Sequence, residues 1–210
     1  MRELILKMSV SIDGFVAGAQ GEISWVFGDD PQATAWTVDT ISGASLHIMG
    51  SRTFRDMAAY WPTSTEVYAP LMNKIPKAVF SRKGQAGLKS AATTTALRQA
   101  RANAGAALGT QQQPGAESWD AAYVASGDLA TEIAKLKAAE GKPIIAHGGA
   151  GFARSLIAQG CIDQYSLLVH PVALGQGLPI FSDLEKPRSL KLVRSIAFPG
   201  GSVAQVYRPA

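Results

Sequence analysis

Two stretches of the sequence end a short apolar run at glycine, and this pattern is suited to binding phosphate. In IIAHGGAGFA, residues 144–153, the apolar run reaches His147 and is followed by Gly148, Gly149 and Gly151. If a helix begins after the glycines, its first backbone N–H groups lack partners and carry the positive end of the helix dipole. Glycine places no side chain between these donors and an anion, so the junction is a potential phosphate site.

The stretch LHIMGSRTF repeats this arrangement and adds side-chain donors. Its apolar run ends at Gly50, and the predicted helix then starts with Ser51, Arg52 and Thr53. The guanidinium of Arg52 is suited to the task because it can donate to two phosphate oxygens at once. The two hydroxyls provide further donors beside those of the backbone.

A third cluster, Ser81-Arg82-Lys83, follows the apolar run KAVF at 77–80. Any one of the three junctions is compatible with a tight turn that binds nothing. The three together, two of them with cations, predict a ligand with several phosphates, such as a dinucleotide. Arg154 stands where a Rossmann fingerprint would have its third glycine, and no segment matches the P-loop pattern. The sequence therefore predicts another nucleotide-binding architecture.

The elements that position these junctions are predicted from apolar runs, turn residues and helix caps. Strands are expected at 3–12, 45–49, 77–80, 121–125, 143–147, 164–170, 190–197 and 202–208. Helices are expected at 31–42, 52–58, 65–73 and 150–159, and between Asp128 and Gly141. Alternating strands and helices imply parallel crossovers, and Pro199-Gly200-Gly201 indicates a closing antiparallel hairpin. The predicted fold is α/β: a mixed, mostly parallel sheet of about eight strands with helices on both faces.

The composition fits a single globular domain over residues 1–210. Hydrophobic residues make up 47% and charged residues 17%, and the formal net charge is +4 without a dense basic run that would indicate nucleic-acid binding. Residues 84–118 differ from the rest because Ala, Gly, Thr and Gln dominate most of them and large apolar residues are few. An alanine-rich helix is conceivable around residues 95–108, but we interpret the segment as a low-complexity insertion at the surface, partly mobile.

Cysteine and histidine usage argues against two further kinds of site. Cys161 is the one cysteine, so no intrachain disulfide can form, and the three histidines are too scattered to predict a metal site. The N-terminal stretch lacks the long apolar core of a signal peptide, and no run approaches the length of a membrane span. We therefore expect a cytoplasmic protein without a bound metal or a membrane partner.

Five motifs, in this order along the chain, resemble the dihydrofolate-reductase-like superfamily, and most closely the reductase domain of riboflavin biosynthesis. They are MSVSIDGFVAG, HIMGSRTF, KAVFSRK, AHGGAGFARSLIAQGCID and HPVALGQGLPIF. The resemblance covers nearly the whole chain except residues 84–118. It implies a three-layer αβα fold, NADPH as the cofactor, and a homodimer in which the apolar region 167–181 supports the interface.

The resemblance also assigns roles to residues of the junctions. It implies that Val16 and Ala17 face the nicotinamide and that Ser81 and Arg82 lie near the adenosine 2′-phosphate. It further implies phosphate contacts from Gly50, Ser51, Arg52 and Thr53. The residues expected to border the pyrophosphate and the nicotinamide are Gly148, Gly149, Ala150, Gly151 and Phe152.

Residues outside the junctions are candidates for a role at the substrate. Asp13, at the end of the first predicted strand, is a candidate proton donor, and the alternative is that Asp13-Gly14 is only a turn. Trp25 resembles the family's tryptophan beside the substrate cleft, with a core position as the alternative. Tyr60 and Trp61 could line the cleft or pack against a hydrophobic edge, and packing is favoured.

The chain also departs from its superfamily. Thr34 stands where folate reductases have the acidic residue that binds the pterin, so folate reduction is disfavoured. These 210 residues have neither the length nor the Cys and His ligands that an additional deaminase domain would need, so we expect a substrate other than the riboflavin intermediate. We therefore predict an NADPH-dependent reductase that transfers hydride to a C=O or C=N bond of a small pteridine- or pyrimidine-like substrate. The alternatives are a non-catalytic nucleotide- or pterin-binding module on the same fold and a weak dihydrofolate reductase.

Overall fold

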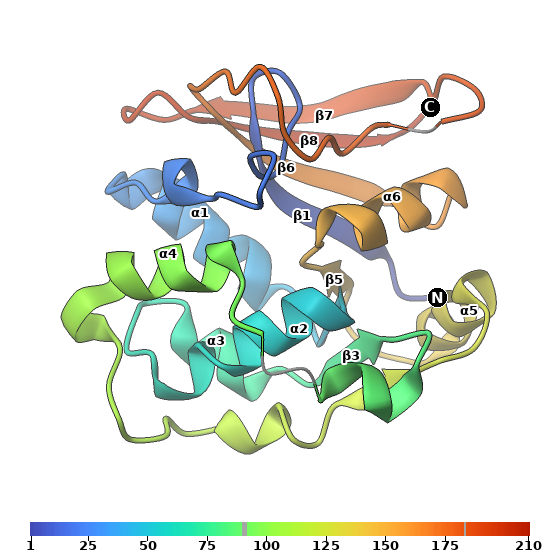
Figure 1. Cartoon of the computed structure of the whole chain (residues 1–210). Coiled ribbons are helices and arrows are strands. Elements are labelled where there is room, and N and C mark those ends of the chain that lie inside the picture. Colours follow the sequence, from blue (N-terminus) through green and yellow to red (C-terminus); the bar gives the residue numbers. More distant parts are fainter. Residues whose placement is uncertain (90–91, 183) are drawn as a thin grey trace.

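Eight strands form one mixed sheet in the computed structural model, which describes residues 1–89, 92–182 and 184–210 (Figure 1). The strands are β1 (Leu4–Ser11), β2 (Leu46–Gly50), β3 (Lys77–Phe80), β4 (Tyr123–Ala125), β5 (Ile144–Ala146), β6 (Gln164–His170), β7 (Leu190–Ala197) and β8 (Val203–Pro209). They lie in the order β4-β3-β2-β5-β1-β6-β8-β7. The first six are parallel, and β8 is antiparallel to both β6 and β7. The mostly parallel sheet and the closing hairpin predicted from the sequence are confirmed.

Helices cover both faces of this sheet, as the strand–helix alternation predicts. They are α1 (Pro31–Ser42), α2 (Ser51–Ala58), α3 (Ala69–Lys74), α4 (Thr95–Ala104), α5 (Leu129–Ala138) and α6 (Ala150–Ala158). Short 3₁₀ turns occur at η1 (Ser24–Val26), η2 (Trp61–Thr63), η3 (Gly84–Leu88), η4 (Gly105–Ala107) and η5 (Ala116–Ser118).

The alternation of side chains along each strand divides the core between the two faces. On one face Leu4 and Leu6 of β1 pack with Leu156 of α6 and Ile133 of α5. On the other face, buried apolar residues of α1, α2 and α3 pack against β2 and β3; they are Ile41, Met49, Phe54, Met72 and Val79. The three-layer αβα arrangement is therefore built from two apolar clusters separated by the sheet.

The segment 84–118 contains more regular structure than its composition predicts. It forms η3, α4, η4 and η5, and Leu97 of α4 is buried. Backbone hydrogen bonds hold the segment to the chain before it, from Thr65 N to Ala107 O at 2.8 Å and from Gly109 N to Thr63 O at 2.9 Å. The surface-insertion interpretation is corrected in this respect: one large apolar side chain and backbone pairing are enough to dock an alanine-rich helix. Residues 90 and 91 of the segment lie outside the described residues.

Asp30 connects the start of α1 to the hairpin between β7 and β8. One carboxylate oxygen accepts from the backbone of Gln32 and Ala33 and so caps α1. The other accepts from Gly200 N at 2.5 Å. The first helix and the last hairpin therefore share one side chain.

Candidate active site

A cleft of about 1740 Å³ lies where the carboxyl ends of the central parallel strands meet α1, α2 and α6. In open parallel sheets this edge is the usual place for ligands. The cleft brings together nearly all of the junction residues that the sequence analysis singled out. Those that line it are Val16, Ala17, Gly50, Ser51, Arg52, Thr53, Ser81, Arg82, Gly149, Ala150, Gly151 and Phe152.

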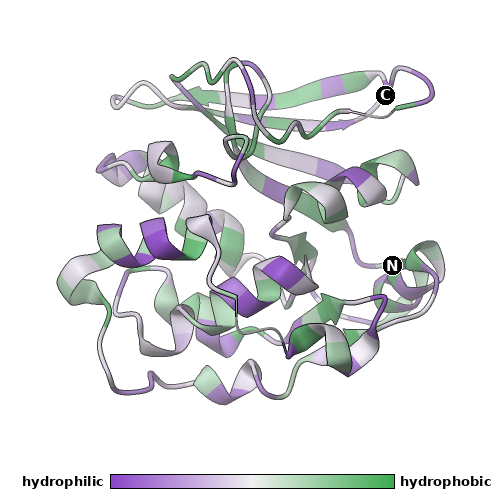
Figure 2. Cartoon of the chain, in the orientation of Figure 1, coloured by the Kyte–Doolittle hydropathy of each residue, from purple (hydrophilic) through white to green (hydrophobic). Residues whose placement is uncertain are grey.

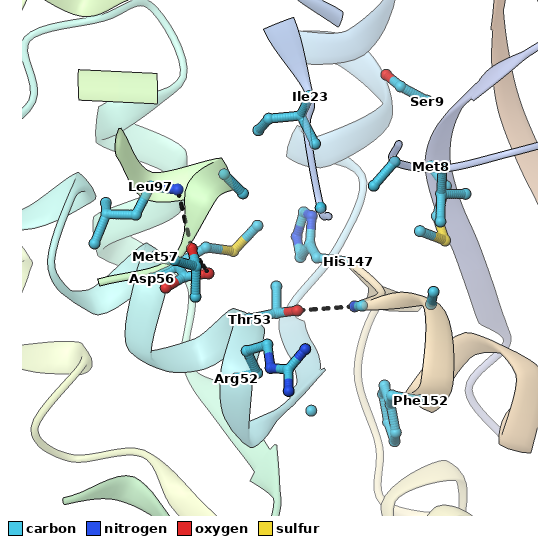
Figure 3. Close-up of a pocket in the computed structure, with 18 of the residues that line it drawn as sticks. Met8, Ser9, Ile23, Arg52, Thr53, Asp56, Met57, Leu97, His147 and Phe152 are labelled. Atoms are coloured by element: carbon cyan, nitrogen blue, oxygen red, sulfur yellow. Dashed lines mark hydrogen bonds between the residues drawn. The ribbon is translucent and has the colours of Figure 1, made fainter. Parts of the chain in front are cut away.

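The N-termini of α2 and α6 face each other across this cleft. Gly149 N donates to Thr53 Oγ1 at 2.9 Å, a bond visible in Figure 3, and Gly50 N approaches Gly148 O at 3.4 Å. A Cβ atom on Gly149 would lie 2.7 Å from Thr53 Oγ1, and one on Gly50 would lie 3.1 Å from the Cβ of Phe152. A side chain at Gly149 would therefore force the two junctions apart, and one at Gly50 would need Phe152 to move slightly.

Gly148 does not line the cleft, but its backbone conformation helps to bring the two junctions into contact. Its φ is +83°, a left-handed conformation that favours glycine. A Cβ there would lie 2.5 Å from Cε of Met8 in β1. The residue thus turns the chain from β5 into α6 close against the central strand.

Helix capping distinguishes α2 and α6 from the other long helices. Among described helices of eight or more residues, α1, α4 and α5 have side-chain caps from Asp30, Thr94 and Asp128. By contrast, α2 and α6 begin after Gly50 and Gly149 without any side-chain cap. Their first N–H groups are left for solvent or a ligand, and both sets lie beside one cleft. This arrangement suits the phosphates of a single ligand.

A smaller cavity of about 400 Å³ adjoins the α2 end of the cleft and is rich in cations. Ser51, Ser81 and Arg82 line both cavities, and Arg55 and Lys83 line the smaller one. The guanidinium of Arg55 is anchored by a 2.8 Å bond from Nη1 to Gly87 O. The third cluster of the sequence thus lies beside the second and could receive a further phosphate.

Lys7 lies in the floor of the cleft and was missed by the sequence analysis. The β1–β5 register pairs Leu6 with Ala146, so Lys7 lies beside His147, and the β1–β6 register pairs Lys7 with Ser166. In the described part of the chain its ammonium has no hydrogen-bond or ion-pair partner. Desolvation lowers the pKa of Lys7 to about 8. The sequence feature that could have identified Lys7 is its position as a single lysine in the middle of the apolar stretch LILKMSVS.

His147 and His47 form a buried pair next to Lys7. Their ring centroids are 4.4 Å apart in an edge-on arrangement, and both Nε2 atoms are buried without a hydrogen-bond partner in the described structure. Burial lowers the pKa of His147 well below its ordinary value and that of His47 to about 3, so both rings are neutral at pH 7. Two lysines lie beside this pair. The ammonium of Lys77, next to His47, donates to Asn73 O and Ser118 Oγ outside the cleft lining, whereas Lys7 lines the cleft and is protonated at neutral pH.

Asp13 does not belong to the cleft lining that the structure describes. Its carboxylate accepts from Ser11 Oγ at 2.5 Å, from Gly175 N at 2.7 Å and from Leu174 N at 3.0 Å. These bonds, that from Ser11 first, lower the pKa of Asp13. A proton donor requires the opposite shift. The proposed catalytic role of Asp13 is therefore not supported, and the turn interpretation accounts for its contacts.

Trp25 also lies outside the cleft lining, whereas its neighbours Ile23 and Val26 line the cleft. The Trp25 ring meets His170 edge-on, with centroids 5.4 Å apart. Its environment favours packing over direct contact with substrate. Tyr60 and Trp61, in contrast to Trp25, both line the cleft and do not only pack against a hydrophobic edge.

The chain belongs to the RibD C-terminal domain family, whose model matches residues 2–204. It is 28% identical over 98% of its length to the uncharacterized protein YyaP of Bacillus subtilis, of which it covers 94%. No helix in the described residues is both long and apolar enough to cross a membrane.

Solved structures show the same fold at low sequence identity. A putative riboflavin biosynthesis protein from Shewanella sp. PV-4 matches with a TM-score of 0.69 and 18% identity, over 100% of this chain and 99% of that one. A diaminohydroxyphosphoribosylaminopyrimidine deaminase/5-amino-6-(5-phosphoribosylamino)uracil reductase from Thermotoga maritima gives 0.65 and 16%, over 100% of this chain and 57% of that one. Dihydrofolate reductase from Enterococcus faecalis gives 0.53 and 11%, over 99% and 96%. The fold is therefore dihydrofolate-reductase-like.

Proposed function

We propose that the protein is an NADPH-dependent reductase that transfers hydride to a C=O or C=N bond of a small pteridine- or pyrimidine-like compound. The observation that carries this proposal is the convergence of two uncapped helix N-termini on one cleft, next to a cation-rich cavity. Membership of a reductase family supports the reaction type.

The residues present fit a dinucleotide with three phosphates. The N-termini of α2 and α6 would hold the pyrophosphate, with Arg52 and Thr53 as additional donors. Ser81, Arg82 and Lys83 would hold the 2′-phosphate in the smaller cavity. Val16 and Ala17, both buried at the cleft wall, would lie against the nicotinamide.

The proposed reduction needs a hydride, a proton, and a site that excludes water and orients the substrate. The dinucleotide, when bound, supplies the hydride. Lys7 is placed to donate a hydrogen bond to the oxygen or nitrogen of the reacting double bond and then to give it a proton, which solvent replaces afterwards. A pKa near 8 is suited to this role because the ammonium is protonated at neutral pH yet gives up its proton readily. The apolar side chains of Met8, Val16 and Ala17 also line the cleft and would limit the access of water to it.

Cofactor binding can be tested by thermal denaturation with NADPH and NADH. We expect NADPH to raise the melting temperature more than NADH. Arg52→Ala and Arg82→Ala should each weaken NADPH binding by about tenfold or more, since a hydrogen bond to a charged group contributes about 1.5–3 kcal/mol. Lys142→Ala, at an exposed cation outside both cavities, is the control and should leave binding unchanged.

Two outcomes would count against parts of the proposal. If neither cofactor raises the melting temperature at millimolar concentration, the dinucleotide site is wrong. If NADPH binds tightly but is not oxidised with any compound in a panel of carbonyl and imine substrates, dihydrofolate among them, the alternative of a non-catalytic binding module is favoured.

A further inference from the structure

The large cleft extends beyond the helix N-termini into a region that the cofactor assignment leaves unused. We call this region the distal arm and define it by six lining residues: Asp56, Met57, Tyr60, Trp61, Glu66 and Tyr68. In Figure 3, Asp56 and Met57 lie near Leu97 of α4, on the opposite side of His147 from Met8. The distal arm therefore begins next to the part of the cleft in which we propose that the reaction takes place.

Three aromatic rings gather along the distal arm. The ring centroids of Tyr60 and Trp61 are 4.9 Å apart at 89°, and those of Trp61 and Tyr68 are 6.4 Å apart at 83°. Aromatic rings attract cations through the negative potential of their faces, and tryptophan does so most strongly. A group of this kind suits a flat or positively charged ligand group.

Two carboxylates accompany the rings. Glu66 is half-buried and interacts with the hydroxyl of Tyr60, an interaction that, together with burial, raises the pKa of that hydroxyl. Asp56 accepts from Thr94 Oγ1 at 2.8 Å, and burial raises the pKa of Asp56 against the opposing effects of Thr94, Arg55 and Arg52. Both carboxylates are hydrogen-bond acceptors beside an open cavity.

Two of the cations near the distal arm, Arg98 and Arg101, are directed to other partners, whereas Arg52 acts on Asp56 from the cofactor end of the cleft. Arg98 of α4 lines the cleft, but its guanidinium donates to Thr93 O and to Thr95 Oγ1, within its own helix start. Arg101 donates to Ala59 O. Asp29 adds a further negative charge to the cleft lining. The distal arm is therefore acidic and aromatic, whereas the cofactor end of the cleft is basic.

We infer that the distal arm binds the part of the substrate remote from the reacting bond, and that this part is a protonated amine or a similar N–H-rich cationic group. This inference rests on the proposed function. A phosphate group in the distal arm would instead lie beside the carboxylates of Glu66 and Asp56, which would repel it. None of the six residues that define the distal arm carries a positive charge. The substrate would thus differ from the phosphoribosylamino compound named for the Thermotoga maritima enzyme.

The inference can be tested with three probes that share one ring: benzylamine, benzyl alcohol and benzyl phosphate. Each is titrated into the full chain in the presence of NADPH while the indole N–H signals of the four tryptophans are followed by NMR. Trp61→Phe identifies the signal of Trp61. We expect benzylamine, protonated at pH 7, to shift this signal and to bind about tenfold more tightly than benzyl phosphate, which corresponds to about 1.4 kcal/mol.

Glu66→Gln tests the charge without removing the acceptor for Tyr60. It should weaken benzylamine binding several-fold and leave benzyl alcohol binding unchanged. Glu140→Gln, an exposed carboxylate outside the cleft, is the control and should change neither. The inference is overturned if benzyl phosphate binds at Trp61 as tightly as benzylamine, or if benzylamine leaves the Trp61 signal unshifted.

Failure of the inference is distinguishable from failure of the proposed function. If NADPH does not stabilise the protein but benzylamine shifts Trp61, the distal arm is a cation site on a protein that is not an NADPH reductase. If NADPH binds and is oxidised but benzyl phosphate is preferred at Trp61, the reductase assignment stands and the substrate class is wrong.

Discussion

Lys7 shows how a single residue can be unfavourable for folding and useful for function. Folding lowers the pKa of Lys7 from 10.5 to about 8 because the ammonium loses water and gains no partner. The charged form is thus disfavoured in the folded protein. The resulting loss of stability is fully present below pH 8 and disappears as the pH rises toward 10.5, where the lysine of the unfolded chain also becomes neutral.

Substitution of Lys7 should therefore separate stability from activity. We expect Lys7→Met to raise the melting temperature at pH 7, with a gain that shrinks between pH 8 and pH 10.5. The same variant should lower kcat by about 10²–10⁴-fold, the usual contribution of a general acid, with NADPH affinity unchanged. In the unsubstituted protein kcat should be level below pH 8 and fall above it.

The opposite result for Lys7→Met would assign the role of proton donor to another group. If Lys7→Met keeps full kcat and the same pH profile, the proton comes from elsewhere. Asp13→Asn serves as the comparison, because its turn contacts predict lower stability with kcat retained.

Residues whose proposed role depends on local chain geometry were predictable from the sequence, whereas those whose proposed role depends on distant neighbours were not. The glycine at 149 was identifiable because a strand, a glycine and a helix start follow one another. Lys7 was not, since its importance depends on His147 and Ser166, which only the sheet register brings beside it. Glu66 was missed for the same reason, because its contact with Tyr60 carries no sequence signal.

At the level of elements, the contact between the starts of α2 and α6 is the feature on which the proposed cofactor binding depends. Gly149 and Gly151 allow a matched test because both line the cleft next to the same helix start. A Cβ on Gly149 would lie 2.7 Å from Thr53 Oγ1, whereas a Cβ on Gly151 would meet nothing within 4 Å.

We expect Gly149→Ala to lower both the melting temperature and NADPH affinity, because Thr53 and the N-terminus of α6 must move apart. Gly151→Ala should keep the melting temperature or raise it, since alanine favours a helix over glycine by about 1 kcal/mol. Differential scanning fluorimetry with and without NADPH measures both effects. Equal melting temperatures for the two variants would show that the junctions do not touch.

The helix α4 lies within the alanine-rich stretch in which a helix was conceivable, but its place at the cleft was not predicted. Figure 2 shows hydrophilic residues along both α2 and α4, and α4 buries one large apolar side chain, Leu97. Polar contacts add to the burial of Leu97 in holding this helix, such as that from Ile23 N to Gln99 Oε1 at 2.6 Å. Contacts across 76 residues of sequence leave no local periodicity, so a wall of the cleft was interpreted as a surface insertion.

At the level of the whole molecule, the strand β7 ends the sheet with apolar side chains in solvent. Leu192 is 51% exposed and Val193 is 54% exposed. A register shift between Leu192 and Arg194 interrupts the ladder there, and such bulges discourage pairing with a further strand. These side chains therefore suit packing against another surface better than extension of the sheet.

We accordingly propose that the chain forms a homodimer that covers β7. Light scattering coupled to size-exclusion chromatography should give twice the 22.1 kDa of one chain. Val193→Lys should shift the protein toward the mass of a single chain without loss of fold. The control Val67→Lys, at a valine that is 58% exposed elsewhere, should keep the assembly. A concentration-independent mass of one chain for the unsubstituted protein would refute the dimer.

The carboxylate of Asp30 gives the molecule a connection between remote parts. It holds the first turn of α1, whose Thr34 and Thr37 line the cleft, and it also holds the hairpin tip at Gly200. A spectroscopic probe attached near Gly200 would consequently report the binding of ligands that displace α1, although Gly200 lies far from Asp30 in the sequence. Fusions or insertions placed in this hairpin risk altering ligand selectivity, whereas the same additions after Ala210 avoid the tether.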